Sequence, residues 1–273
     1  MSRLLAIVIL LGACGSPGGA GDGGGDDAPS SDGGPPRDAP GTVAISAFDP
    51  SITRVSVEID YETGEAPYTG TMAGFGDTFD ISIANIERLF AGTKPIAIPR
   101  TVATMEDIGA VADEQVTVAD ILALAAAHRS QRDAPGLKTY YVVFVSGLFT
   151  DAVGPKAGVL GVSLGTTGVI AMFKDVIAST SAVGNVQRFV EQSTLVHELG
   201  HAIGLVNNGV PLSSPHQDGS HGAHCTDRDC VMYWQNEGAS DMTAWATQHV
   251  LANTTILFRP DCLADVDALT GGP

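Results

Sequence analysis

Hydrophobic and polar positions are arranged in two different ways along this chain, and the first arrangement predicts strands. Residues 139–146 form an unbroken run of β-branched and aromatic side chains, which is typical of a strand buried on both faces. Residues 158–164 and 169–173 predict two further strands, and the alternation over residues 52–61 predicts a strand near the start of the folded part. We expect 158–164 to be the edge strand of the resulting sheet.

The second arrangement has helical spacing. Apolar residues recur at helical intervals over 116–129, and a shorter helix is expected over 81–90. His128, at the end of the first of these helices, is expected to interact with the helix dipole and not with a metal. The longest helix is predicted to begin at Asn185, a residue type that caps helices, and to end at Gly204, which tolerates a left-handed backbone.

The last turns of this longest helix contain the sequence H-E-L-G-H. His197 and His201 are four residues apart, so they lie on one helix face and can each offer an imidazole nitrogen to one tetrahedral metal ion. Glu198 follows the first histidine, where its carboxylate can take a proton from a water activated by the metal. A buried Glu198 without such a role would be costly. The pattern therefore predicts a Zn²⁺ hydrolase with Glu198 as general base.

The residues alone leave the third metal ligand open. Gly204 turns the chain out of the helix, so that side chains further along can return toward the metal. The segment that follows is rich in suitable side chains, and four of them compete for the position: His216, Asp218, His221 and His224.

The helix motif and its continuation resemble the metzincin clan of metallopeptidases, whose pattern is H-E-x-x-H-x-x-G-x-x-H followed by a methionine turn. Asn207 departs from that pattern, because it stands where the clan has a histidine or an aspartate. The sequence H-C-T-D-R-D-C-V-M over residues 224–232, however, closely matches the corresponding ending of the archaemetzincins. The resemblance implies that His224 is the third zinc ligand, with His221 and His216 as alternatives.

The same resemblance implies a fold and further roles. It extends over residues 193–233 and implies an α+β fold of the metzincin-like zincin type, with a mixed twisted sheet, an active-site helix and a methionine turn. Met232 would be the methionine-turn residue, packed beneath the metal without binding it. Asn208 to Ala223 would be an insertion that displaces the third histidine.

Three cysteines lie in the folded part of the chain. In an oxidising compartment Cys225 and Cys230 can close a small disulfide, which leaves Cys262 free. In the archaemetzincins the corresponding cysteines belong to a second, structural zinc site completed by a later C-x-x-C pair, and this chain lacks that pair. We therefore expect the disulfide, with a metal site of three cysteines and one histidine as the alternative.

The N-terminus predicts export. Residues 1–14 combine a short cationic start with an apolar run of signal-peptide length, and L-G-A-C resembles a bacterial lipobox in which Cys14 is lipidated. Residues 15–41 consist almost entirely of Gly, Asp, Pro, Ser and Ala, which predicts a disordered tether. Residues 42–273 would form the catalytic domain. The expected location is extracytoplasmic, either anchored by lipid to the cell envelope, in particular the outer membrane, or secreted.

Charge excludes one class of partner. The chain has 14 basic and 31 acidic residues, a formal net charge of −17, so no basic patch is available to replace the counterions of a nucleic acid. The sequence thus predicts a zinc-dependent metallopeptidase that acts on a peptide or protein substrate, an endopeptidase in preference to an exopeptidase. The alternative is a lipid-anchored, non-catalytic protein that binds zinc or another ligand, for which Asn207 is the best argument.

Overall fold

The protein is described here by a computed structural model that covers residues 46–112 and 114–271. The predicted signal peptide ending at Cys14 and the predicted tether over residues 15–41 lie outside these described residues. Among the described helices, none combines the length and the apolar character needed to cross a membrane.

A mixed sheet forms the centre of the described fold. Its strands follow the order β10-β11-β7-β1-β4, and β5 also pairs with β1. The strands β1, β4, β5, β7 and β11 run parallel, while β10 is antiparallel to β11 and lies at one edge. The bounds of these strands are β1 Arg54–Tyr61, β4 Ile96–Ala97, β5 Glu106–Asp107, β7 Leu137–Val145, β10 Gly161–Ser163 and β11 Val169–Phe173.

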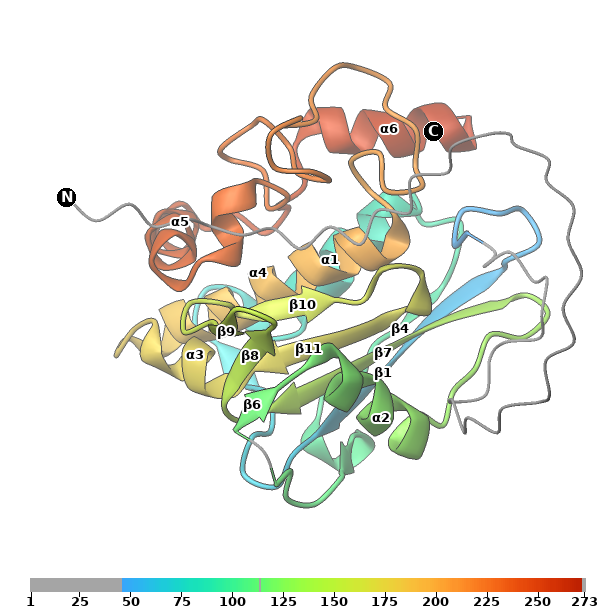
Figure 1. The fold of residues 1–273 in the computed structure, drawn as a ribbon. Helices are drawn as coiled ribbons and strands as arrows, with labels where there is room; N and C mark the ends of the chain where they lie inside the picture. The colour runs from blue at the N-terminus through green and yellow to red at the C-terminus, as the bar shows by residue number, and fades with distance from the viewer. Residues whose placement is uncertain (1–45, 113, 272–273) are drawn as a thin grey trace, which may run out of the picture.

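Helices cover this sheet on two sides, α1 and α4 on one and α2 on the other (Figure 1). The inner strand β7 is buried from Lys138 to Val145, as expected for a strand enclosed by helices on both faces. The helices are α1 Asp80–Leu89, α2 Val118–His128, α3 Lys174–Ser179, α4 Gly184–Ile203, α5 Ala239–Ala252 and α6 Pro260–Thr270.

Short elements complete the described structure. They are the strands β2 Thr71–Met72, β3 Gly76–Asp77, β6 Gln115–Val116, β8 Leu148–Asp151 and β9 Gly154–Pro155, and the 3-10 turns η1 Val102–Thr104, η2 Gly165–Thr167 and η3 Trp234–Glu237. Between α4 and η3 the chain forms turns and loops that are held by isolated backbone bridges.

The mixed sheet and the main elements were predicted correctly from the sequence. The strand over residues 169–173 is confirmed at both ends, and the helices over 81–90 and 116–129 are confirmed with shifts of one or two residues. The strand predicted over 158–164 is confirmed in part, because only Gly161–Ser163 pairs with β11.

The helix α4 starts within one residue of the predicted position, but its N-cap was predicted wrongly. The helix begins at Gly184 with Val183 as its N-cap, and no side chain caps it. The amides of Val186 and Gln187 bond instead to the Val183 carbonyl oxygen, so Asn185 already lies inside the first turn. At the other end, Gly204 has a left-handed backbone with φ of 106°, which ends the helix as predicted.

A buried ion pair joins α3 to α4. The ammonium of Lys174 contacts the carboxylate of Glu191, and both side chains are almost fully buried. The other carboxylate oxygen of Glu191 accepts the amide of Tyr68 at 2.7 Å, and the Lys174 ammonium lies 3.6 Å from the centre of the Tyr68 ring. This pair fixes the segment around Tyr68 against the helix that carries the H-E-L-G-H motif.

Candidate functional site

Three histidine rings converge at the end of α4. His197 and His201 come from successive turns of the helix, and His224 comes from the loop region after it. The Nε2 atom of His201 lies 3.1 Å from Nε2 of His197 and 3.2 Å from Nε2 of His224. Three ligand atoms this close form a group that can hold one metal ion.

Backbone carbonyls set the orientation of two of these rings. Nδ1 of His197 lies 2.7 Å from the carbonyl oxygen of Val231, and Nδ1 of His224 lies 2.6 Å from the carbonyl oxygen of His221. Because a carbonyl only accepts, the ring proton sits on Nδ1 in both residues, and each Nε2 keeps its lone pair. The two rings are therefore prepared to bind a metal through Nε2.

The donor set fits zinc. Tetrahedral zinc with Zn–N bonds of about 2.0–2.1 Å places neighbouring nitrogens roughly 3.3 Å apart, close to the separations seen here. Burial, with the neighbouring rings of His197 and His224, holds the pKa of His201 well below its usual range, so the ring is neutral as a ligand must be. Three protein ligands leave a fourth position for water or substrate, the arrangement of catalytic zinc sites.

Glu198 is on the side of α4 that faces the edge strand β10. Its side chain is 4% exposed. A Cβ atom added to Gly161 of β10 would lie 2.9 Å from Cγ of Glu198 and 3.0 Å from Cγ2 of Thr194, closer than normal packing allows. The glycine is thus what lets the edge strand approach the carboxylate.

Met232 packs against the same helix at Gly200. It is fully buried, and a Cβ atom added to Gly200 would lie 2.5 Å from its sulfur. The amide of Cys225 donates to the Met232 carbonyl oxygen at 2.7 Å, which ties this turn to the loop that carries His224. Gly200, between the two helix histidines, is therefore required for the approach of Met232.

The other candidate ligands point elsewhere. His221 contacts Asp218 through Nδ1 at 2.7 Å, and its ring stacks on Trp234 with centroids 4.0 Å apart. Asn207 is exposed, and its amide donates to Gln217. Of the residues that competed for the third position, the structure brings only His224 to the helix histidines.

The remaining alternative, His216, joins a different cluster. One ligand atom of His216 and the sulfurs of Cys225 and Cys262 lie within 4.8 Å of one another, and the Cys230 sulfur lies 3.5 Å from that of Cys262. All three cysteines are free thiols, so the structure lacks the predicted disulfide between Cys225 and Cys230. The physical reason is geometric, because each thiol faces a shared centre in place of a single partner.

The three thiols differ in acidity. Hydrogen bonds from Cys230 and Cys262 lower the pKa of the Cys225 thiol. Burial raises the pKa of Cys230, and the hydrogen bonds to Cys225 and Cys230 raise that of Cys262. Cys225 is therefore the most acidic of the three thiols.

Sequence reasoning missed several residues of these clusters. Gly161 and Gly200 contribute by lacking a side chain, which no motif search detects. Asp265 on α6 contacts Nε2 of His216 at 2.7 Å, although it lies 49 residues further along the chain. The general preference of a buried histidine for a carboxylate partner was the available signal, and it does not specify which carboxylate.

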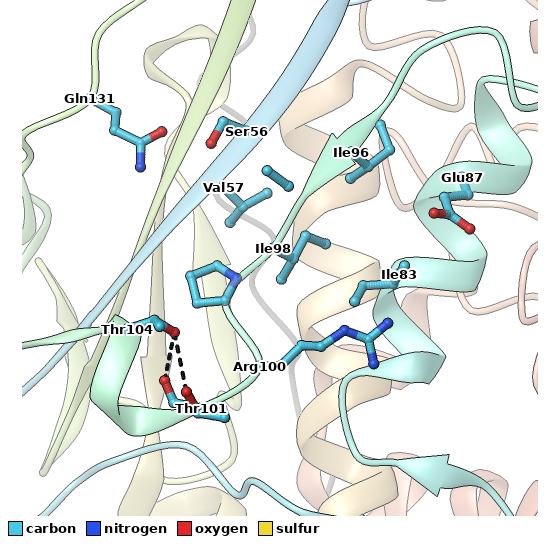
Figure 2. A pocket seen from close by; sticks show the side chains of 12 residues that line it. Ser56, Val57, Ile83, Glu87, Ile96, Ile98, Arg100, Thr101, Thr104 and Gln131 are labelled. Atoms are coloured by element: carbon cyan, nitrogen blue, oxygen red, sulfur yellow. Dashed lines mark hydrogen bonds between the residues drawn. The ribbon is translucent and has the colours of Figure 1, made fainter.

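A pocket of about 480 Å³ lies apart from both clusters, along the sheet edge formed by β4. Ile83 and Glu87 of α1, Val57 of β1 and the segment from Ile96 to Thr104 line it (Figure 2). Its one arginine, Arg100, is already paired with Asp80. None of its lining residues belongs to the histidine or thiol clusters.

Comparison with known proteins gives a distant result. No protein-family model matches the chain, and no curated protein matches it. Among solved structures, archaemetzincin from Methanopyrus kandleri is similar with 13% identity and a TM-score of 0.44 over 82% of this chain and 98% of that one. A zinc-dependent peptidase from Methanocorpusculum labreanum is similar with 14% identity and a TM-score of 0.43, over 78% and 99%. At this distance the function has to be argued from the site.

Proposed function

We propose that this protein is a zinc-dependent metallopeptidase in which His197, His201 and His224 hold Zn²⁺. The observation that carries the proposal is the convergence of the three Nε2 atoms at the helix that also carries Glu198. A structural zinc site closes its coordination with a fourth protein ligand, whereas three imidazoles next to a carboxylate leave one position open. His201 is partly exposed, which supports access to that position from outside.

The chemistry divides between the metal and the chain. Zinc, when bound, polarises the carbonyl group and makes the attacking water more acidic. Glu198 takes the proton of that water and passes it to the departing nitrogen. The carbonyl oxygens of Val231 and His221 accept the Nδ1 protons of His197 and His224 and so hold both rings in the tautomer that binds. Met232 packs against the helix at Gly200.

The edge strand supports a peptide as substrate. β10 pairs with β11 on one side and ends the order of the described sheet, and Glu198 lies against it. An extended peptide can add to such an edge through backbone hydrogen bonds, which places its carbonyl groups beside the general base. Internal peptide bonds suit this arrangement, so we propose an endopeptidase.

The test compares Glu198→Gln with the wild-type full-length chain, using zinc content by elemental analysis and cleavage of an unstructured protein followed by mass spectrometry. We expect the variant to keep its zinc and to lose hydrolysis by about 10²–10⁴-fold, since it removes a general base without removing a ligand. Glu87→Gln is a matched control, because Glu87 is an exposed carboxylate on α1 away from the site.

Two results would overturn the proposal. Activity of Glu198→Gln equal to the wild type would remove the general-base role. Zinc-loaded wild-type protein that cleaves no protein or peptide would favour the alternative, a non-catalytic binding protein. Export and lipid anchoring at Cys14 remain predictions from the sequence, which mass spectrometry of the mature N-terminus would test.

A further inference from the structure

We propose that Cys225, Cys230, Cys262 and His216 form a second metal site of the three-cysteine, one-histidine type, which fixes the loop that carries His224. All four side chains are buried, with 2% exposure at His216 and none at the cysteines. The archaemetzincin resemblance implies four cysteines at such a site, and this chain cannot supply them. The new element is the imidazole, which comes from the segment inserted before His224.

His216 has one ring nitrogen to spare. Its Nε2 lies 2.7 Å from a carboxylate oxygen of Asp265, while its Nδ1 is buried, interacts with the Cys225 thiol and makes no hydrogen bond of normal geometry. A buried nitrogen without such a bond is costly in a finished protein interior. Because Nε2 is engaged, Nδ1 is the atom left for the thiol cluster, and a metal there would satisfy it.

Asp265 holds this histidine firmly. Its other carboxylate oxygen accepts the amide and the hydroxyl of Ser213, at 2.6 Å and 2.9 Å. A carboxylate behind a histidine fixes the ring and raises its basicity as a metal ligand, an arrangement that recurs in zinc proteins. Asp265 is therefore a positioning residue for the second site.

The spacing of the sulfurs fits a metal better than a disulfide. The sulfurs of Cys230 and Cys262 lie 3.5 Å apart. Zinc–sulfur bonds of about 2.3 Å place tetrahedral neighbours roughly 3.8 Å apart, whereas a disulfide needs about 2.05 Å. A disulfide would also leave one of three buried thiols unused, while zinc uses all three with His216 as the fourth ligand and closes the site.

The second site lies at the base of the loop that presents His224. The amide of Thr226 donates to the carbonyl oxygen of His216 at 2.8 Å, and the amide of Asp218 donates to that of His224 at 2.7 Å. His216 and Cys225 thus stand at the two ends of one closed loop, and His224 directly precedes Cys225. A metal shared by the two ends would hold His224 in place. This last step rests on the proposed role of His224.

The experiment measures metal stoichiometry and the absorption of the Co²⁺-substituted full-length protein. We expect two metals per chain and a thiolate-to-cobalt charge-transfer band, which three imidazoles alone do not produce. One metal per chain with no thiolate band would overturn the second site, and this outcome is independent of any peptidase activity.

Variants then test the imidazole. His216→Ala should weaken retention of the second metal against a chelator by at least tenfold, and Asp265→Asn by about 10–100-fold, as for other partners of metal-binding histidines. His216→Cys should restore retention with a stronger thiolate band. The matched control is His128→Ala at the end of α2, away from both clusters, which should retain both metals. A His216→Ala protein that retains the second metal and its spectrum unchanged would overturn the assignment of His216.

Coupling between the sites has its own readout. In His216→Ala the metal held by the three histidines should also dissociate faster. The measurement is the decay of the cobalt absorption of that site, which is distinguished from the second site by having no thiolate band. An unchanged rate for the first metal would overturn the coupling and leave the second site standing. Should His216→Ala fail to fold, the wild-type cobalt spectrum still decides whether thiolates bind metal.

Discussion

The part of the molecule before Gly204 and the loop region that follows it, residues 205–233, both bury side chains completely, but they do so by different means. The first part is built from a sheet and helices, where packing of apolar side chains and regular backbone hydrogen bonds suffice. The loop region has no regular helix or strand, yet Leu205, Val206, Cys225, Cys230 and Met232 are fully buried in it.

Order in the loop region must therefore come from specific contacts. Isolated bridges, side-chain bonds such as that of His216 to Asp265, and the two candidate metal sites are what the structure offers. Irregular backbone carries a large entropic cost for each residue that is fixed. The difference between the regions teaches that a metal can replace regular secondary structure as the source of order.

Metal removal should have the largest effect, and it should be confined to the loop region. A strong chelator is expected to increase amide hydrogen exchange over residues 205–233 by several orders of magnitude, because metal binding and local folding are linked. The amides of β1, β7 and β11 should remain protected. Hydrogen exchange read by mass spectrometry checks this, and an equal loss of protection in both regions would contradict the contrast.

Lys174→Met should destabilise the sheet and helix region. The substitution leaves Glu191 buried without its cation, and burial already raises the pKa of that carboxyl. The free energy of unfolding should fall by about 3–5 kcal/mol, measured by urea denaturation, with no change in metal content. Arg88→Met is the control, since Arg88 pairs with Asp267 at the surface, where both side chains are about one-third exposed, and the substitution should cost less than about 1 kcal/mol. Loss of metal from Lys174→Met would show that the two regions are not separate.

Asp60→Asn should have the smallest effect and the opposite sign at neutral pH. Burial raises the pKa of Asp60 to about 6, and one of its carboxylate oxygens has no hydrogen-bond partner. Because the folded state holds this proton more tightly than the unfolded state, wild-type stability falls as pH rises from about 4 to about 6. The variant should therefore exceed the wild type by up to roughly 3 kcal/mol at pH 7 and match it near pH 4.

A control of opposite sign accompanies this measurement. Hydrogen bonds from Thr63 and Gly109 lower the pKa of Asp107. Asp107→Asn should accordingly be less stable than the wild type at neutral pH. Chemical denaturation of both proteins at pH 4 and pH 7 measures this difference. If the difference in unfolding free energy between Asp60→Asn and the wild type did not change with pH, titration of the buried Asp60 carboxyl would not be its cause.

The contrast between the regions also explains how far the sequence could be interpreted. The strand Val169–Phe173 and helix α4 follow from local patterns, because apolar periodicity and a terminating glycine act on neighbouring residues. His197, Glu198 and His201 lie on one helix, so their mutual placement followed from helix geometry alone.

Residues brought together by loops were much harder to predict. The prediction of His224 depended on a resemblance, since nothing in the spacing of four loop candidates selects one of them. The free thiols and the pairing of His216 with Asp265 depend on where α6 packs, and that placement is a property of the whole fold. The prediction of a disulfide between Cys225 and Cys230 was wrong for this reason. It considered two cysteines that are close in sequence, whereas Cys262 approaches them only in the folded structure.

The closed loop between His216 and Cys225 has one more consequence. Its two ends are fixed and buried, while Gly219 and Ser220 at its tip are exposed. A change in the length of the tip therefore leaves the spacing of the ends, and with it the position of His224, unaltered. In evolutionary terms the loop is a place where the chain can gain or lose residues beside its most constrained atoms.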